Sequence, residues 1–190
     1  MDLLEKKILE EGTVIGSEIL KVDSFLNHQI DVSLTNEMGK EIYAHFKNSN
    51  VNKILTVEAS GIGLACIVAQ YFNCKVVFAK KSKTRQLTDD LYCANVHSFT
   101  HGDDNIIRVS KKYIDSQDTV LILDDFLAMG EAVNGMMDIV KQAGAKLAGV
   151  AIAIEKGFQG GGDKLRAQGI DLYSLAIVDR MSENGIQFRK

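Results

Sequence analysis

Four short charged or small-residue segments in this chain have side chains that together suit an anionic ligand carrying hydroxyl groups. Ionised carboxylates only accept hydrogen bonds, so they match the two O–H donors of a vicinal diol, while lysine ammonium groups match phosphates. Each segment directly follows an apolar run of the sequence. The four are Glu58-Ala59-Ser60-Gly61, Lys80-Lys81, Asp124-Asp125 and Glu155-Lys156.

The adjacent acids Asp124 and Asp125 leave three interpretations open. They could hold a sugar diol, they could hold a divalent cation through oxygen ligands, or they could form a solvated turn in which one Asp caps a helix. The residues that follow, Phe126 to Ala132, favour ligand binding. Small residues at a helix N-terminus leave backbone N–H groups open to a phosphate, and the helix dipole favours negative charge there.

The elements that must position these segments alternate between strand and helix from Lys53 onward. Apolar runs at residues 54–57, 76–79, 120–123 and 147–154 predict buried strands, with helical spacing between them. This alternation predicts an α/β fold of βαβ units, in which a parallel sheet is covered on both faces. Because the carboxyl ends of parallel strands share one edge, we expect the four segments to converge there.

Smaller elements are predicted around this sheet. A short amphipathic helix should end at Gly12, and Asp31 or Ser33 should cap a second helix. Residues 91–99 and 106–109 predict an antiparallel pair. Asn184-Gly185 predicts a hairpin turn. Gly160-Gly161-Gly162 lacks dinucleotide-loop spacing and predicts a flexible connector.

Composition bounds the class of protein. The chain has 190 residues, of which 46% are hydrophobic and 25% charged, which predicts one globular domain. A formal net charge of −3 provides no basic face for nucleic acid. No run of residues is long and apolar enough for a bilayer, and no signal peptide is recognisable. Three cysteines without CxxC spacing indicate reduced thiols, so we expect a cytoplasmic protein without a membrane or nucleic-acid partner.

Residues 120–132 resemble the phosphoribosyl pyrophosphate (PRPP) signature of the type I phosphoribosyltransferases, in which an apolar strand is followed by two acids, a small-residue loop and a helix. Residues 20–29, with Ile154-Glu155-Lys156 and Phe158-Gln159, resemble more narrowly the bacterial xanthine phosphoribosyltransferases. The resemblance covers nearly the whole chain. It implies a Rossmann-like parallel-sheet core in a single domain 1–190, with a small hood from about 1–35 and 155–190.

The resemblance also implies a reaction. The protein would join xanthine to PRPP in purine salvage, giving XMP and pyrophosphate, with Mg²⁺ accompanying PRPP. By the same resemblance it would be a homodimer. Asp124, Asp125 and Lys81 would be the catalytic residues, the two acids holding the ribose hydroxyls. Ser82 to Asp90 would form a loop that covers the site. PRPP would also contact Ala128, Met129, Gly130, Glu131 and Ala132 through its 5′-phosphate, and Glu58, Ala59, Ser60, Gly61 and Lys80 through its pyrophosphate.

The phosphate loop departs from the family pattern at two positions. Ala128 and Met129 stand where many members carry Ser or Thr, so phosphate binding would rest on backbone amides. Glu131 suits the helix dipole but would repel a phosphate, so its carboxylate is expected to point away.

The implied purine-binding residues are Leu20, Phe25, Asn27 and Lys156. The Lys156 ammonium only donates, so it can serve a carbonyl at C6 of a purine but mismatches the amino group of adenine. Asn27 offers both a donor and an acceptor for the C2 side of xanthine, and Leu20 and Phe25 could supply apolar walls. Leu20 could equally be a core residue, and Lys156 a solvated surface lysine.

Two other functions remain open at this point. The chain could use another purine, such as guanine, hypoxanthine or adenine. It could instead be a non-catalytic regulator that senses PRPP on the same fold, although such a protein would need a nucleic-acid module, and no basic extension is present. No general base for the purine nitrogen can be identified.

Overall fold

The computed structural model describes residues 1–82, 90–97, 104–182 and 184–189. Its main feature is a mixed sheet of eight strands. These are β3 (Lys53–Val57), β4 (Lys75–Ser82), β5 (Leu91–His97), β6 (Asp104–Ser110), β7 (Thr119–Leu127), β8 (Lys146–Lys156), β9 (Leu172–Ser182) and β10 (Gly185–Phe188). The strand order is β10-β9-β8-β7-β3-β4-β6-β5.

The centre of the sheet is parallel, as the sequence predicts. Strand β3 pairs in parallel with β4 and β7, and β7, β8 and β9 continue the parallel arrangement. The two edges are antiparallel. The predicted pair β5–β6 and the predicted hairpin β9–β10 are both confirmed, and β6 joins β4 with Lys81 opposite Ile107.

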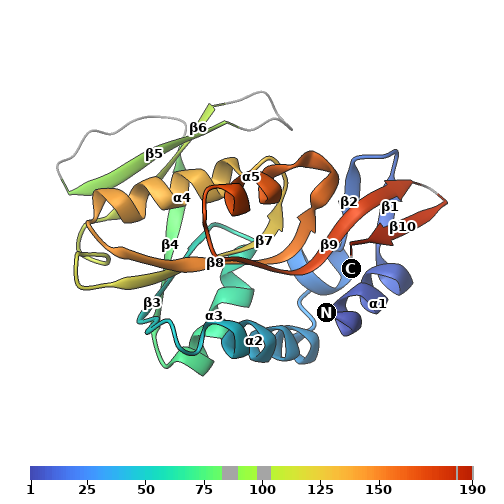
Figure 1. The fold of residues 1–190 in the computed structure, drawn as a ribbon, viewed down its shortest axis with the longest axis horizontal. Helices are drawn as coiled ribbons and strands as arrows, with labels where there is room; N and C mark the ends of the chain where they lie inside the picture. Colours follow the sequence, from blue (N-terminus) through green and yellow to red (C-terminus); the bar gives the residue numbers. More distant parts are fainter. Residues whose placement is uncertain (83–89, 98–103, 183, 190) are drawn as a thin grey trace.

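Helices cover both faces of the sheet (Figure 1). Helices α2 (Val32–Phe46) and α3 (Gly61–Phe72) pack on one face, and α4 (Glu131–Gln142) and α5 (Gly161–Ala167) on the other. Alternate residues of β7 serve the two layers, with Leu121 and Leu123 in one hydrophobic cluster and Val120 and Ile122 in the other. This two-sided burial explains why the strand is a continuous apolar run instead of an alternating one.

The N-terminal segment packs beside the end of the chain. Helix α1 (Asp2–Glu11) ends at Gly12, as predicted, and precedes the short hairpin of β1 (Thr13–Ile15) and β2 (Ile19–Lys21). A π-helical turn, η1 (Asp23–Asn27), leads to α2, which Asp31 caps by accepting the Leu34 N–H at 3.0 Å. Figure 1 shows α1 and both hairpin strands next to β9 and β10, and the Met1 amine donates to the Leu175 carbonyl.

The prediction of a flexible connector at Gly160 to Gly162 is wrong. A 3₁₀ turn, η2 (Gly157–Gln159), follows β8, and Gly161 and Gly162 are buried at the start of α5. A Cβ atom at Gly161 would lie 2.2 Å from the Ala128 carbonyl oxygen, and one at Gly162 would lie 2.0 Å from Glu155 Oε1. These glycines therefore allow close packing, which the sequence alone does not distinguish from flexibility.

In the part of the chain that the structure describes, no helix combines the length and apolar character needed to cross a membrane.

Candidate functional site

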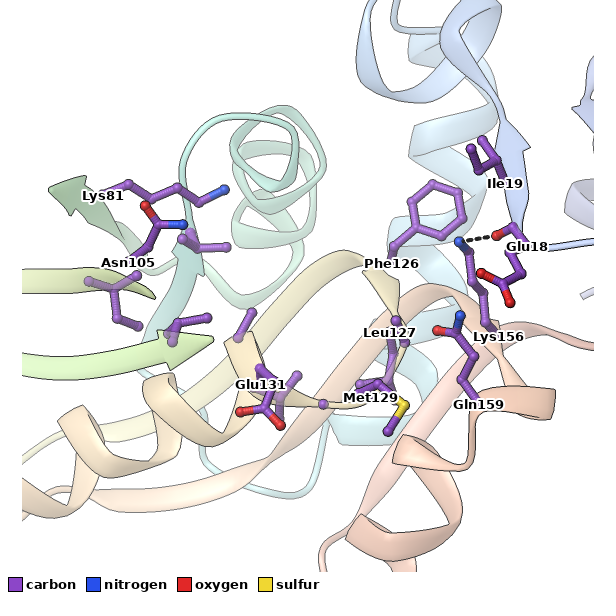
Figure 2. Close-up of a pocket in the computed structure, with 17 residues that line it drawn as sticks. Glu18, Ile19, Lys81, Asn105, Phe126, Leu127, Met129, Glu131, Lys156 and Gln159 are labelled. Carbon is purple, nitrogen blue, oxygen red and sulfur yellow. Dashed lines mark hydrogen bonds between the residues drawn. The ribbon is translucent and has the colours of Figure 1, made fainter. Parts of the chain in front are cut away.

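A cavity of about 350 Å³ opens at the edge of the sheet where the parallel strands end (Figure 2). The segment from Phe126 to Val133 forms its floor. Lys81 stands at one end of the cavity and Lys156 at the other. The remaining lining residues are Glu18, Ile19, Val57, Val96, Asn105, Ile107 and Gln159. Of the four predicted segments, two therefore contribute to the lining, through Lys81 of β4 and Lys156 of β8, and the loop after β7 forms the floor.

Asp124 and Asp125 are buried within β7, only 5% and 7% exposed. The strand continues to Leu127, so the interpretation as a solvated turn is wrong. The Asp125 N–H donates to Asp124 Oδ1 at 3.0 Å. Burial, reinforced by the neighbouring charge of Asp125, raises the pKa of Asp124 well above its ordinary value. The two acids directly precede the cavity floor, although they do not themselves line the cavity.

The predicted phosphate loop connects β7 to α4, and all five of its residues line the cavity. Gly130, at φ +95°, is the N-cap of α4, a conformation that glycine adopts without steric cost. The N-terminal end of α4 therefore borders the cavity, where its dipole favours an anion. Figure 2 shows the carboxylate of Glu131 directed away from Lys81.

The predicted pyrophosphate loop, Glu58 to Gly61, is tied to the strand that carries Lys81. The Glu58 N–H donates to the Ala79 carbonyl at 3.1 Å, and Glu58 Oε1 accepts the Lys81 N–H at 2.6 Å. The peptide between Glu58 and Ala59 is cis. None of these four loop residues lines the cavity.

Gly61 leaves room for the side chains of Thr56 and Asp124, both of which a side chain at this position would crowd. A Cβ atom at Gly61 would lie 2.2 Å from Thr56 Oγ1 and 3.2 Å from Asp124 Oδ1. Thr56 Oγ1 is buried and makes no hydrogen bond within the described part of the chain.

Lys80 and Lys81 point to opposite sides of β4, because successive residues of a strand alternate between faces. Lys81 lines the cavity, whereas Lys80 lies in a separate groove, with its Nζ 6.0 Å from the centre of the Phe78 ring. The structure therefore separates the predicted lysine pair. The covering loop predicted at Ser82 to Asp90 falls mostly on residues 83–89, which lie outside the described residues.

Lys156 is half-buried and bound to the main chain instead of extending into solvent. Its Nζ donates to the Glu18 carbonyl at 2.7 Å, and it lies 5.8 Å from the centre of the Phe126 ring. Burial lowers the pKa of this ammonium group, an effect that the Glu18 carboxylate partly opposes. The bond joins the β1–β2 turn to the end of β8 across the cavity (Figure 2).

The other three predicted purine-binding residues do not line this cavity. Leu20 and Phe25 belong to the hydrophobic core, 6% and 0% exposed, and Asn27 is exposed on η1. The burial of Leu20 agrees with its interpretation as a core residue. A purine contact for these three residues stays a prediction.

Two features of the site were missed by sequence reasoning. Glu155, fully buried, accepts hydrogen bonds from Arg166 at 2.9 and 2.7 Å and from the Ser174 hydroxyl at 2.5 Å. Gln159 lines the cavity three residues after Lys156, and its Oε1 is buried. The first feature could not be predicted because its partners, Arg166 and Ser174, lie 11 and 19 residues from Glu155 in the sequence. The second could have been found from the three-residue spacing, had the 3₁₀ turn been predicted.

Comparison with known proteins gives a consistent result. Residues 21–166 match the model of the phosphoribosyl transferase domain. The chain is 58% identical over 188 residues to the xanthine phosphoribosyltransferase of Ruminiclostridium cellulolyticum, covering 99% of each chain. It is 53% identical to the enzyme of that name from Clostridium novyi, over 100% of both.

Solved structures confirm the predicted fold class. The adenine phosphoribosyltransferase of Giardia lamblia superposes with a TM-score of 0.77 at 21% identity, covering 92% of this chain and 96% of that one. The enzyme from Rhodothermus marinus gives 0.73 at 20% identity, covering 94% and 100%.

Proposed function

The chain belongs to the phosphoribosyl transferase family, and from that premise we propose that it transfers the 5-phosphoribosyl group of PRPP to xanthine, giving XMP and pyrophosphate. The observation that carries this proposal is the arrangement of the cavity. A loop leading into a helix N-terminus forms its floor, one cation lies at each end, and a buried acid pair directly precedes the floor.

Each part of the cavity suits one part of the reaction. The N–H groups at the start of α4 bind the 5′-phosphate, and Asp124 and Asp125 accept hydrogen bonds from the ribose hydroxyls. Lys81 attracts the pyrophosphate, and Lys156 holds the base at the other end. In the reaction a purine nitrogen forms a bond to C1′ while the bond from C1′ to the pyrophosphate oxygen breaks, and pyrophosphate leaves with the electron pair. The proton on that nitrogen passes to solvent.

The charge that develops in this step explains the residue types. Positive charge grows on the sugar ring as pyrophosphate departs, and buried carboxylates next to the ring stabilise that charge. The phosphate loop meanwhile holds the ribose so that C1′ faces the base. The proposed pyrophosphate contacts of Glu58, Ala59, Ser60, Gly61 and Lys80 remain part of the assignment. The strand geometry supports Lys81 more directly than Lys80.

The residues present fit an Mg²⁺ ion that arrives with PRPP. No cluster of three or more His, Cys, Asp or Glu side chains capable of holding a metal is found among the described residues. Mg²⁺ in phosphate enzymes is commonly held by one or two carboxylates together with the phosphates of the substrate. Asp124 and Asp125 directly precede the floor and would hold the ion, which would neutralise charge on the departing pyrophosphate.

Three further assignments belong to this proposal. Residues 1–35 and 155–190 of the single domain form a hood over the base, which is supported by the bond between Lys156 and the Glu18 carbonyl. The protein is cytoplasmic. It is also a homodimer, an assignment that rests on the family resemblance, and sedimentation velocity would test it.

The function is tested by incubating the protein with PRPP, Mg²⁺ and one base at a time. We expect XMP and pyrophosphate to form from xanthine, with adenine the poorest substrate. If guanine or hypoxanthine is the preferred substrate, the proposed reaction is correct but the proposed base is wrong. Formation of no nucleotide from any base, together with tight PRPP binding, would favour the regulator instead.

A further inference from the structure

Gln159 places an unused hydrogen-bond acceptor beside the lysine that holds the base. Gln159 lines the cavity, and its Oε1 is buried and has no hydrogen-bond partner within the described part of the chain. A buried amide oxygen without a partner is costly, because it has lost its hydrogen bonds to water. Such an atom at the wall of a cavity is the expected arrangement for a group whose partner is a ligand.

The local backbone fixes this position. Gln159 is the last residue of η2, and Lys156 is the N-cap directly before that turn, at the end of β8. Only Gly157 and Phe158 lie between the two residues, which keeps them close together. Gly160, at φ +74°, closes the turn with its N–H bound to the Gly157 carbonyl at 3.0 Å. Figure 2 shows Gln159 and Lys156 together at one end of the cavity.

The two side chains have complementary chemistry. The Lys156 ammonium has donors only, and one of them is already used by the Glu18 carbonyl. An oxopurine presents a carbonyl at C6 and an N–H at the neighbouring ring position N1, so a site with Lys156 alone leaves that N–H without an acceptor. Adenine carries no hydrogen at N1.

We propose that Gln159 is a specificity-determining residue of the purine site, whose Oε1 accepts a hydrogen bond from the N1–H of an oxopurine while Lys156 donates to the C6 carbonyl. The proposal rests on the proposed function and extends it from one residue to a donor–acceptor pair. It explains the rejection of adenine by two mismatches. The C6 amino group of adenine would place a donor against the Lys156 ammonium, and the lone pair on N1 of adenine would face the Gln159 oxygen.

The test is a comparison of Gln159→Leu with the unaltered protein, using xanthine and 1-methylxanthine as substrates at saturating PRPP. We expect the KM for xanthine to rise about 10- to 100-fold, because one buried hydrogen bond is lost. The KM for PRPP should stay within about twofold, since the phosphate loop is unchanged. The ratio of the KM for 1-methylxanthine to that for xanthine should fall at least about fivefold, because methylation then removes no bond.

Three controls keep the result decisive. Gln168→Leu alters an exposed glutamine and should change neither KM. Gln159→Glu keeps an acceptor, so the ratio of the KM for 1-methylxanthine to that for xanthine should fall less than in Gln159→Leu. If Gln159→Leu does not fold, Gln159→Met, which is closer in shape, replaces it.

The outcomes separate this inference from the function on which it rests. If the unaltered protein uses no purine, the proposed function fails. If it uses xanthine and Gln159→Leu leaves the KM and the methylation ratio unchanged, the function stands and the role of Gln159 is overturned. A rise in the KM for both substrates with an unchanged ratio would overturn it as well, because the residue would then act through packing.

Discussion

The Arg166 guanidinium donates two parallel hydrogen bonds to the Glu155 carboxylate, with N–O distances of 2.9 and 2.7 Å. Glu155 is fully buried and directly precedes Lys156 in β8, whereas Arg166 lies on α5. The pair therefore fastens the helix that begins beside the phosphate loop to the strand that carries the base-holding lysine. Both partners are bidentate, which fixes orientation as well as distance.

Arg166→Met is expected to lower the free energy of unfolding by about 3 kcal/mol, because it leaves a buried carboxylate without its cation. Urea denaturation measures this change. Lys164→Met is the matched control, since Lys164 is exposed on the same helix and should change stability by less than about 0.5 kcal/mol. Equal small effects for the two variants would contradict a structural role for the pair.

Asp124→Asn is expected to stabilise the fold at pH 7 while weakening PRPP binding. The folded chain holds the Asp124 proton more tightly than the unfolded chain, whose pKa is near the ordinary value of 3.8. The contribution of this group to stability is therefore complete below about pH 3.8 and is lost as the pH rises through the raised pKa.

Urea denaturation at pH 7 and pH 4 checks this prediction. The stability gained in Asp124→Asn should shrink toward pH 4. The KM for PRPP should rise about tenfold or more, because a charged acceptor for a ribose hydroxyl is lost. If Asp124→Asn is less stable than the unaltered protein at pH 7, then the surroundings of Asp124 stabilise its ionised form. That outcome would contradict the prediction.

Lys156→Met is expected to affect the use of oxopurines far more than stability. The substitution keeps the apolar stem and removes the donors, so the KM for xanthine should rise about 100-fold and discrimination against adenine should fall. Steady-state kinetics with both bases measures this effect. Lys146→Met, at the exposed beginning of the same strand, should leave both KM values unchanged. A thermal destabilisation that accounts for the lost activity would mean that the bond to the Glu18 carbonyl is the main role of Lys156.

Gly161→Ala is expected to displace the phosphate loop. Its Cβ would lie 2.2 Å from the Ala128 carbonyl oxygen and 2.6 Å from the Met129 carbonyl carbon, and main-chain atoms cannot move aside as a flexible side chain can. The KM for PRPP should rise about tenfold as the loop shifts. Titration with PRPP followed by calorimetry would confirm the change in affinity.

Gly160→Ala provides the neighbouring control for this prediction. Its Cβ would meet nothing within 4 Å, so the only cost is the left-handed backbone at φ +74°. That cost is about 1 kcal/mol of stability. Similar PRPP affinity in the two alanine variants would show that the contact with Ala128 does not hold the loop.

Much of the fold could be predicted because strand burial leaves a direct trace in the sequence. Apolar runs such as Val120–Leu123 are long enough to identify, and the parallel arrangement follows from the helices between them. The cap at Asp31 and the hairpin indicated by Asn184-Gly185 depend on local chemistry, so they too are visible without a structure, although Gly185 is the first residue of β10 and not part of the turn.

The site was only partly predictable because several of its contacts join distant segments. The separation of Lys80 from Lys81 follows from strand alternation and could have been foreseen once β4 was extended through both residues. The packing of Gly161 against Ala128 could not have been foreseen, because glycine is typical both of close backbone contacts and of flexible segments. The burial of Glu155 likewise depends on Arg166, which lies 11 residues further along the chain, on α5.

Strand β7 lies between β3 and β8, and only one of these neighbours precedes it in the chain. Without β8, whose first residue is Lys146, β7 has no neighbour on that side. Its apolar run then has an unpaired hydrogen-bonding edge, the kind of edge that recruits strands from other molecules. A translation product that stops at Gly144 would contain the whole phosphate loop and yet accumulate as insoluble aggregate.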